Sequence, residues 1–534
     1  MDENAAVAHR LAGLSPDQRA AATARPGPVL CIAPAGSGKT TTLIARIAWL
    51  ADGGVDPATI AAITFNRRAA VELRVRLAQA LAPLGIPADA VRVRTFHALG
   101  LEILHDAGGA VGPIADRASI LESLFPDLGR AGLGELDATI SRLKVDLGVS
   151  GAEVARDEAA GPVARSYLAY EQSLAASGSL DFDDLGAGAL KALWADAGLL
   201  ERWRDRCRHL LVDEVQDIDR MQLQLALRLA APDNWIFLVG DDDQSIYGWR
   251  LADVRRIFGL AARLPGLERR QLATNYRCPR PVVERSLRLI SRNRERFAKA
   301  VRAGPDGAGR LVLAPDGGPD DIRIGRVLDG WPADGTSRAV IARTNAELVP
   351  AAAVAVARGI PFRAPGVDLP IEAAGLDQAL AAVLAESSAD RELPLLVQVG
   401  RVRRAAADPE VARACDDLIG WAARFRTAGD LGTAVATWRV ELERLRRAEA
   451  ALSLTTAHSV KGLEFDHVLV LMDADRFPSR RALDDAADPA RALEEERRLA
   501  YVAWTRARRS LTLLYDPDAP SRFLVEAFDP SELG

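Results

Sequence analysis

One glycine-rich segment constrains the fold more than any other feature of this 534-residue sequence. Ala33-Pro34-Ala35-Gly36-Ser37-Gly38-Lys39-Thr40 follows an apolar run (29–33) and precedes a stretch of helical period (39–50). A strand, a glycine loop and a helix N-terminus in this order surround an anion with backbone N–H groups. The segment predicts a phosphate-binding loop in which Lys39 reaches the β- and γ-phosphates and Thr40 ligates Mg²⁺. The alternative, a glycine turn with a chance lysine, does not explain why a strand and a helix flank it.

Lysine is rare in this chain, so the position of each lysine is informative. Of the 68 Lys and Arg residues, five are lysines: Lys39, Lys144, Lys191, Lys299 and Lys461. Codon bias explains the excess of arginine, but a lysine retained under that bias needs a chemical reason. The net charge of −5 argues weakly against a nucleic-acid binder, which often has a strongly basic domain. The apolar half and charged quarter of the residues are typical of a globular protein.

Short apolar runs alternate with helical stretches, a pattern that predicts parallel sheets of the doubly wound α/β class. The expected strands are residues 29–33, 61–65, 91–95, 210–213, 236–240, 269–274, 339–342, 452–457, 467–472 and 511–515. Helices are expected at 39–50 and 68–82, and a surface loop at 303–319 around the short run 310–314. The strands fall into two groups, one ending near Asn275, which predicts two α/β domains. Two helical stretches, 101–179 and 368–451, interrupt them as insertions.

The four cysteines (Cys31, Cys207, Cys278 and Cys415) form no CxxC pair, so the sequence predicts neither a zinc nor an iron–sulfur site. A reducing, cytoplasmic compartment fits this usage. The N-terminus lacks the features of a signal peptide, and no apolar run reaches the roughly 20 residues that span a bilayer. We therefore expect no membrane partner.

Two further motifs suit a nucleotide-driven protein. Asp213 and Glu214 end an apolar strand, where Asp213 is expected to hold Mg²⁺ and Glu214 to orient and deprotonate the attacking water. Alone, such a pair is usually a solvated loop, but beside a phosphate loop it gains specificity. The run 239–250 places Gln244 before Tyr247, Trp249 and Arg250. Exposed aromatic rings stack on unpaired bases; the alternative, core packing, fits poorly with i, i+2 spacing among polar residues.

In this order and spacing, the motifs resemble those of UvrD/Rep-type superfamily 1A DNA helicases across nearly the whole chain. Leu14-Ser15-Pro16-Asp17-Gln18 resembles the Q motif, in which Gln18 reads adenine. Residues 63–70 resemble motif Ia and residues 95–98 motif Ib, which contact single-stranded DNA in the family. The resemblance assigns that contact to Phe65, Arg67, Phe96 and His97. Residues 180–185 match the segment that returns from the first insertion, and 213–217 and 240–250 match motifs II and III.

The second half of the chain shows the same resemblance. Thr274-Asn275-Tyr276-Arg277 resembles motif IV, which implies that Tyr276 stacks on adenine and Arg277 contacts the γ-phosphate. Residues 342–345 and 359–362 resemble the next landmarks. Residues 455–465 resemble motif V, which implies DNA contact for His458 and contact with the nucleotide sugar for Glu464. Residues 494–507 resemble motif VI, in which Arg506 is the second arginine finger.

The resemblance implies two RecA-like P-loop NTPase domains, each with a helical insertion. The expected boundaries are 1–100 and 180–275 for domain 1A, 101–179 for insertion 1B, 276–367 and 452–534 for domain 2A, and 368–451 for a reduced insertion 2B. Catalysis is assigned to Lys39, Glu214, Gln244, Arg277 and Arg506. The nucleotide contacts add Gln18, Ala35, Gly36, Ser37, Gly38, Thr40, Thr41, Tyr276 and Glu464. The DNA contacts are Phe65, Arg67, Phe96, His97, Tyr247, Trp249, Arg250 and His458.

The implied function is an ATP-dependent 3′→5′ DNA helicase or single-stranded DNA translocase in repair, replication or recombination. It would use ATP and Mg²⁺, and act on single-stranded DNA and single-strand/duplex junctions in the bacterial cytoplasm, associated with the nucleoid. Closure of the two domains on a nucleotide would drive movement along the strand.

Three alternatives remain open at this stage: a translocase or motor subunit that does not unwind alone, a non-motor ATP-gated DNA-binding module, and RNA as substrate. Thr41 and Trp504 depart from the family pattern, and the short second insertion puts processive unwinding in doubt. The chain stops soon after motif VI, so neither a following nuclease domain nor a C-terminal partner-docking module is expected.

Overall fold

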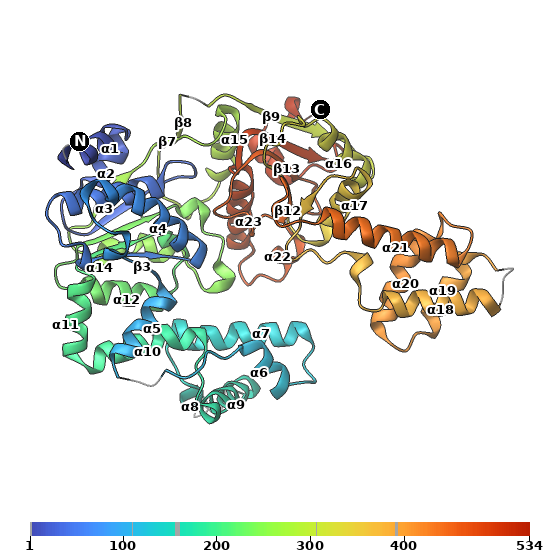
Figure 1. The fold of residues 1–534 in the computed structure, drawn as a ribbon, viewed down its shortest axis with the longest axis horizontal. Helices are drawn as coiled ribbons and strands as arrows, with labels where there is room; N and C mark the ends of the chain where they lie inside the picture. The colour runs from blue at the N-terminus through green and yellow to red at the C-terminus, as the bar shows by residue number, and fades with distance from the viewer. Residues whose placement is uncertain (1–2, 109–110, 155–160, 306, 390–392, 534) are drawn as a thin grey trace. The chain divides into compact units, whose positions relative to one another are not determined.

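Parallel ladders dominate the computed structural model, which describes residues 3–108, 111–154, 161–305, 307–389 and 393–533 (Figure 1). All strand pairs in its two six-stranded sheets are parallel. Strands in such sheets are covered on both faces, so they consist of nearly continuous apolar runs. The α/β class expected from the alternating pattern is therefore confirmed.

The first sheet carries the glycine-rich loop. Its strand order is β3-β2-β4-β5-β1-β6. The bounds are β1 Val29–Ile32, β2 Ile60–Thr64, β3 Arg92–Thr95, β4 His209–Val212, β5 Ile236–Gly240 and β6 Glu268–Gln271. A separate two-stranded ladder pairs β7 (Thr274–Asn275) with β8 (Arg302–Ala303). The ends of five of these strands lie within one residue of their expected positions, and β6 ends three residues earlier than expected.

The second sheet has the order β11-β12-β10-β13-β14-β9. Its strands are β9 Arg310–Pro315, β10 Arg338–Ala342, β11 Phe362–Arg363, β12 Leu452–Thr456, β13 Phe465–Leu471 and β14 Ala507–Tyr515. The expected loop at 303–319 is wrong over its middle part, because residues 310–315 form edge strand β9, parallel to β14. The Gly, Pro and Asp residues around this run hid a strand whose partner lies about 200 residues later in the chain.

Helices flank both sheets. Those of the first half outside the insertion are α1 Glu3–Ala12, α2 Pro16–Ala22, α3 Lys39–Asp52, α4 Arg67–Leu81, α5 Phe96–Asp106, α10 Phe182–Ala195, α11 Ala197–Arg206, α12 Arg220–Ala230, α13 Arg255–Phe258 and α14 Leu260–Arg263. Those of the second half outside its insertion are α15 Arg280–Ile290, α16 Asp320–Asp329, α17 Val349–Ala357, α22 Arg480–Asp484, α23 Pro489–Trp504 and α24 Arg522–Ala527.

Alternate residues of each strand in the first sheet point into separate cores. Leu30 and Ile32 pack with α5, α10, α11 and α12, while Val29 and Cys31 pack with α3 and α4 on the opposite face. This alternation follows from the two-residue period of a strand. In the second sheet, Val340 and Ala342 pack with α16, α17 and α21. Burial on both faces holds the carboxyl ends of the strands, which carry the motifs, at fixed positions.

Each helical insertion has a small core of its own. The first contains α6 Arg117–Leu124, α7 Arg130–Ser141, a π-helical turn Arg142–Leu147, α8 Gly151–Val154 and α9 Gly161–Ser177. The second contains α18 Leu376–Ala389, α19 Leu395–Ala405, α20 Pro409–Ala422 and α21 Ala428–Leu445. The described residues of both stretches contain no named strand, as the sequence indicates.

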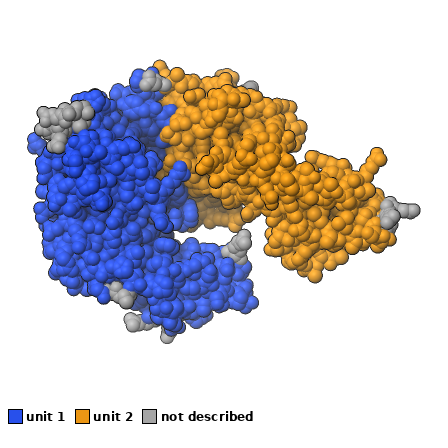
Figure 2. Space-filling model, in the orientation of Figure 1, with its two compact units in different colours: residues 1–277, 290–306 blue, residues 278–289, 307–534 orange. Residues whose placement is uncertain are grey.

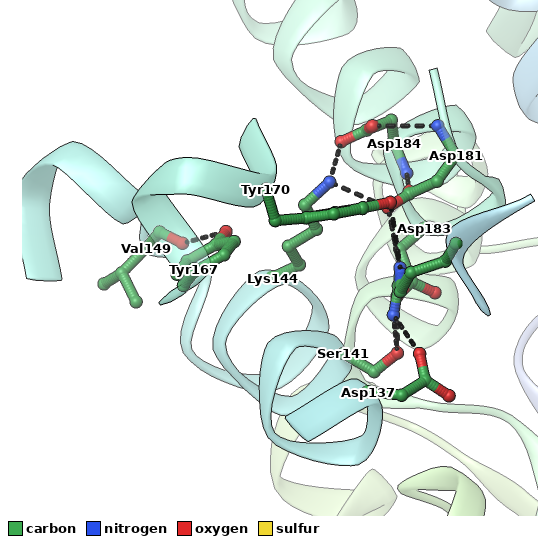
Figure 3. A network of polar contacts seen from close by, with 10 residues as sticks. Asp137, Ser141, Lys144, Val149, Tyr167, Tyr170, Asp181, Asp183 and Asp184 are labelled. Atoms are coloured by element: carbon green, nitrogen blue, oxygen red, sulfur yellow. Dashed lines mark hydrogen bonds and ion pairs between the residues drawn. The ribbon is translucent and has the colours of Figure 1, made fainter. Parts of the chain in front are cut away.

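A buried polar network joins the first insertion to the start of α10 (Figure 3). Asp181, which is 1% exposed, accepts hydrogen bonds on Oδ2 from Lys144 Nζ at 2.9 Å, Arg117 Nη2 at 2.7 Å and the Tyr170 hydroxyl at 2.7 Å. Lys144 also bonds Asp184 at 2.9 Å. Burial acts to raise the pKa of Asp181, but Arg117 and Lys144 hold it well below its usual range. The network gives Lys144 the specific partner that the sequence did not reveal.

The chain divides into two compact units, coloured separately in Figure 2. Unit 1 comprises Met1–Arg277 and Ile290–Asp306; unit 2 comprises Cys278–Leu289 and Gly307–Gly534. This differs from the expected boundary after residue 275, because Tyr276 and Arg277 belong to unit 1. The Tyr276 N–H donates to the Gly36 carbonyl at 2.8 Å, which ties motif IV to the glycine-rich loop. The finer division into four subdomains stays a prediction.

Within the described part of the chain, every helix is too short or too polar to cross a lipid bilayer.

Candidate nucleotide and nucleic-acid sites

The glycine-rich loop has a backbone that only glycine suits at two positions. Gly36 and Gly38 have φ values of +69° and +83°, in the left-handed region. A Cβ on Gly36 would lie 2.5 Å from Asn275 Oδ1, and one on Gly38 would lie 2.5 Å from Gln18 Nε2. Helix α3 begins directly after this loop, at Lys39. Its unpaired N–H groups and dipole favour an anion there.

A cavity of about 520 Å³ opens beside this loop, within the size range of small-ligand pockets. Its lining consists of Gly13, Leu14, Ser15, Gln18, Gly36, Gly38, Thr41 and Tyr276. Tyr276 is 49% exposed there, and its ring offers an aromatic face for a base. Five residues expected to contact the nucleotide are thus brought together: Gln18, Gly36, Gly38, Thr41 and Tyr276.

The Q-motif helix α2 is held against the loop by its polar residues. Gln18 Nε2 donates to the Ser37 carbonyl at 2.8 Å, and Asp17 accepts from the Ala273 N–H at 2.6 Å. Buried Arg46 on α3 donates to the carbonyls of Ala22 and Ala24 at the other end of α2. These bonds fix the position of one wall of the cavity.

Arg76 on α4 was missed in the sequence. Its guanidinium donates to Thr41 Oγ1 at 2.9 Å, so a basic group lies next to the lining residue that departs from the family pattern. Because 35 positions separate the two residues, no local motif indicates this contact.

The acidic pair of motif II lies close to Lys39. Lys39 Nζ is 3.9 Å from Glu214 Oε1, and Glu214 has a left-handed backbone with φ of 52°. Non-glycine residues in this region carry strain that is concentrated at functional sites. Burial, together with the neighbouring Glu214, raises the pKa of Asp213 to about 7.

The chemistry of these residues fits a magnesium–nucleotide complex. The buried Ser37 hydroxyl has no hydrogen-bond partner, and the pKa of Asp213 stays raised although the positive charge of Lys39 acts to lower it. A hard cation with oxygen ligands supplies further positive charge. Thr40 and Asp213 are the residues that would hold Mg²⁺, with phosphate oxygens and water completing the coordination.

A hydrogen-bonded chain links motif II to motif III. Gln216 donates to Glu214, and Gln216 Oε1 accepts from the Asp241 N–H at 3.0 Å. Asp241 Oδ2 in turn accepts from Gln244 Nε2 at 2.6 Å. The sequence predicts roles for Glu214 and Gln244 but none for Gln216 or Asp241, whose importance appears only when the two strands β4 and β5 are seen side by side.

Three aromatic rings and an arginine, from motifs Ia and III, form a row. Phe65 and Tyr247 stack with centroids 5.1 Å apart, and Tyr247 meets Trp249 edge-on at 6.2 Å. The Arg250 guanidinium lies 5.4 Å from the Trp249 ring centroid. Trp249 is 65% exposed, so core packing does not account for it. The structure therefore brings together four of the residues expected to contact DNA.

The motif Ib residues divide between surface and core. Phe96 is 5% exposed and packs with Leu99 and Ile103 on the apolar face of α5, so its ring belongs to the core of this structure, and its expected DNA contact stays a prediction. Its i, i+3, i+7 spacing with those residues is the signal of a core position. His97 is half-buried and meets Phe182 edge-on at 5.6 Å. Phe182 is 60% exposed, a surface ring that the sequence did not single out. Arg67 is exposed at the start of α4.

Three predicted residues, Arg506, Glu464 and His458, lie in unit 2, whereas Arg277 lies in unit 1. The Arg506 guanidinium is buried and donates to the carbonyls of Val502 and Leu463. Glu464 is exposed and lies 3.3 Å from Arg508. Burial, with Arg343 nearby, lowers the pKa of His458 to about 4.

Two contacts stabilise this region of unit 2. Arg343 forms a two-pronged ion pair with Glu496 on α23. Trp504 is fully buried next to Phe528, which explains structurally why a large ring occupies this position.

Comparison with known proteins assigns the family. The UvrD/REP helicase N-terminal domain matches residues 14–265, and the UvrD-like helicase C-terminal domain matches residues 434–517. The ATP-dependent DNA helicase UvrD2 of Mycobacterium tuberculosis is 31% identical over 96% of this chain and 81% of its own length. The chain belongs to the UvrD/Rep helicase family. UvrD1 of Mycobacterium tuberculosis is 29% identical over 94% of this chain and 82% of its own length. Escherichia coli DNA helicase II is 28% identical over 97% of this chain and 88% of its own length.

As a UvrD/Rep family member, the chain has two RecA-like domains, in agreement with its two parallel sheets. The resemblance read from the motif order is confirmed.

Proposed function

We propose that this UvrD/Rep family member is a DNA helicase that hydrolyses ATP to move 3′→5′ along single-stranded DNA and unwind duplexes. One observation carries the proposal furthest. The bonded chain from Glu214 through Gln216 and Asp241 ends at Gln244, three residues before Tyr247 in the aromatic row. A nucleotide site and a base-stacking surface are thus joined within one unit by a few directional bonds.

In the nucleotide site, the loop residues Ala35, Gly36, Ser37 and Gly38 hold the phosphates through backbone N–H groups. Lys39 neutralises the β- and γ-phosphate oxygens, and Glu214 orients and deprotonates the attacking water. Thr40 and Asp213 would hold Mg²⁺, which would supply positive charge to the phosphate oxygens. Gln18 reads the adenine edge and Tyr276 stacks on its face, while Arg277 contacts the γ-phosphate. Gln244 contacts the γ-phosphate and couples its presence to the position of the aromatic row.

On the DNA side, Phe65, Tyr247 and Trp249 offer ring faces to unpaired bases, and Arg67 and Arg250 pair with phosphates. Phe182 and His97 extend the exposed aromatic surface. His458, in unit 2, is proposed to contact the same strand, and Glu464 the nucleotide sugar. Arg506 is proposed as the second arginine finger; its role rests on the motif and is tested by substitution.

The decisive experiment is an ATPase assay with and without oligo(dT), together with unwinding of duplexes that carry a 3′ or a 5′ single-stranded tail. We expect oligo(dT) to raise kcat and only the 3′-tailed duplex to unwind. Hydrolysis that ignores single-stranded DNA would contradict a motor role, and unwinding from the 5′ tail would contradict the direction. Oligo(U) in place of oligo(dT) distinguishes DNA from RNA as the substrate.

A second candidate function is a translocase that displaces proteins from DNA or drives a larger complex without unwinding alone. The observation that favours it is the small insertion between β11 and β12, in which four helices surround one core. It predicts DNA-stimulated hydrolysis and displacement of a protein bound to the strand, with no separation of either duplex. We propose a bacterial cytoplasmic location, associated with the nucleoid and with single-strand/duplex junctions, for either function.

A further inference from the structure

A second buried lysine, Lys299, lies among the three consecutive aspartates of motif III. Lys299 Nζ is 2.7 Å from Asp241 Oδ1, 2.6 Å from Asp242 Oδ1 and 2.9 Å from Asp243 Oδ2. The side chains of all four residues, which we call the Lys299 cluster, are at most 1% exposed. Burial acts to lower the pKa of Lys299, but the three carboxylates raise it above its usual value, so the ammonium remains charged.

The geometry of the Lys299 cluster matches the chemistry of lysine. An ammonium has three N–H donors that point in three directions. Two of them bond Asp241 and Asp242, and the positive charge also forms an ion pair with Asp243. Arginine offers a planar fork, which suits one or two carboxylates in its plane and needs more space. This explains why a chain with five lysines among 68 basic residues has one here.

The cluster fastens a returning segment of the chain to motif III. The chain leaves unit 1 after Arg277, re-enters at Ile290 and leaves again after Asp306. Within the re-entered segment, Arg296 bonds Asp243 through Nε at 3.0 Å and Nη2 at 2.8 Å, and the Phe297 N–H donates to Asp242 at 2.8 Å. Lys299 thus anchors the part of unit 1 that is covalently connected to unit 2 at both ends.

The other side of the cluster faces the nucleotide site. Asp241 accepts from Lys299 on Oδ1 and from Gln244 on Oδ2. Its backbone N–H donates to Gln216, which is bonded to Glu214. Burial acts to raise the pKa of Asp241, but Lys299 and Lys39 together lower it, so both lysines act on the same carboxylate. A displaced Asp241 would release Gln244 and Gln216 together.

We propose that Lys299 is a positioning residue of the motor, which couples nucleotide binding to DNA binding by holding Asp241 and the returning segment in one arrangement. Lys299 touches neither ligand in this proposal. It sets the position of Gln244 and, through the backbone, that of Tyr247. The returning segment, which is covalently connected to unit 2 at both ends, is held in place by the same contacts. The inference rests on the proposed function, because it assigns Gln244 to the nucleotide and Tyr247 to DNA.

The test measures coupling rather than turnover. The dissociation constant of fluorescent oligo(dT) for the full chain is determined with and without a non-hydrolysable ATP analogue, and the ratio of the two values gives the coupling. For the unsubstituted chain we expect a ratio that differs from one by at least about fivefold, the usual lower bound of allosteric coupling. In Lys299→Met we expect a ratio within about twofold of one, while each ligand alone binds within about threefold of its normal affinity.

Controls separate positioning from stability. Lys191 is an exposed lysine of the same unit, so Lys191→Met should leave the ratio unchanged. If Lys299→Met fails to fold, the double variant Lys299→Met, Asp242→Asn removes one buried carboxylate, and Lys299→Arg keeps the charge. Both are expected to lose coupling, because methionine carries no charge to hold Asp241 and the planar fork of arginine cannot pair with all three carboxylates.

A folded Lys299 variant of any of these three kinds that retains the normal ratio would overturn the inference. An unsubstituted chain with DNA-stimulated ATPase but a ratio of one would also overturn it. A chain without DNA-stimulated hydrolysis would instead overturn the proposed function.

Discussion

The ammonium of Lys39 lies 3.9 Å from the carboxylate of Glu214 at the carboxyl end of the first sheet. Lys39 is expected to bind phosphate oxygens, and Glu214 to bind the water that attacks them. The short distance between the two side chains therefore agrees with their acting on the same phosphate. Because Lys39 follows the loop after β1 and Glu214 follows β4, the parallel sheet brings the two residues to the same edge.

Replacing Lys39 by Ala should reduce DNA-stimulated kcat by at least about a hundredfold, the usual effect of removing one preorganised electrostatic group. The protein should remain folded, since Lys39 lies at the end of the glycine-rich loop and outside the two hydrophobic cores of the first sheet. Steady-state ATPase with circular dichroism as the folding check measures this. Lys191→Ala is the matched control, and full hydrolysis by Lys39→Ala would refute the phosphate-loop assignment.

Replacing Trp249 by Ala should weaken oligo(dT) binding by roughly fivefold to a hundredfold, because a base–aromatic stack contributes about 1–3 kcal/mol. The KM for ATP in the absence of DNA should stay unchanged. Trp194 provides a control of equal size: it is 58% exposed on α10 and lies outside the aromatic row. Fluorescence anisotropy measures both variants, and an equal loss in Trp194→Ala would argue against a specific stacking role for Trp249.

Asp181→Ala should destabilise the protein by about 3–5 kcal/mol, because it leaves buried Lys144 and Arg117 without their shared carboxylate. Arg117 also pairs with Asp137 at 3.2 Å, but the Asp137 side chain is 54% exposed. Asp137→Ala should therefore cost no more than about 0.5 kcal/mol. Urea unfolding followed by circular dichroism compares the two variants, and similar losses for both would show that burial of the network does not control its energy.

Asp219→Asn should flatten the dependence of the unfolding free energy on pH between about pH 4 and 7. Burial raises the pKa of Asp219 to about 7, so the native state binds more protons than the unfolded state in this range and loses stability as the pH rises. Asparagine keeps the N-cap of α12, in which Asp219 accepts from the Gln222 N–H at 2.8 Å.

At pH 8 the Asp219→Asn variant should be more stable than the native sequence by about 1–3 kcal/mol. This is less than the roughly 4 kcal/mol that three pKa units correspond to, because Asp219 is half-buried and water screens part of its charge. Asp196 caps α11 from an exposed position, so Asp196→Asn is the control and should keep the native slope. If the unfolding free energy of Asp219→Asn changed with pH as steeply as that of the native sequence, this prediction would be contradicted.

The sequence was most informative where chemistry and local geometry coincide. The glycine-rich loop, the acidic pair and the aromatic run could be predicted because each combines a rare residue pattern with a strand end. The core position of Phe96 follows from its spacing with Leu99 and Ile103, a signal that the motif match alone does not contain. Strand β9 was missed because its partner β14 is remote in sequence, and β pairing leaves no local mark.

The polar networks could not be predicted for the same reason. Lys144 meets Asp181 across 37 positions, and Lys299 meets Asp241 across 58. Neither separation along the sequence corresponds to a helical or strand period, so only the folded chain reveals these partners.

The burial of lysine also determines how the surface reacts with amine-directed reagents. The side chains of Lys39, Lys144 and Lys299 are 13%, 5% and 0% exposed, whereas Lys191 is exposed. Succinimidyl labels and lysine-directed cross-linkers will therefore modify Lys191 before these three lysines, and a dye placed there reports on unit 1. A surface rich in arginine is nearly invisible to this chemistry, so cross-linking of DNA-bound assemblies requires carboxylate-directed or photoreactive reagents.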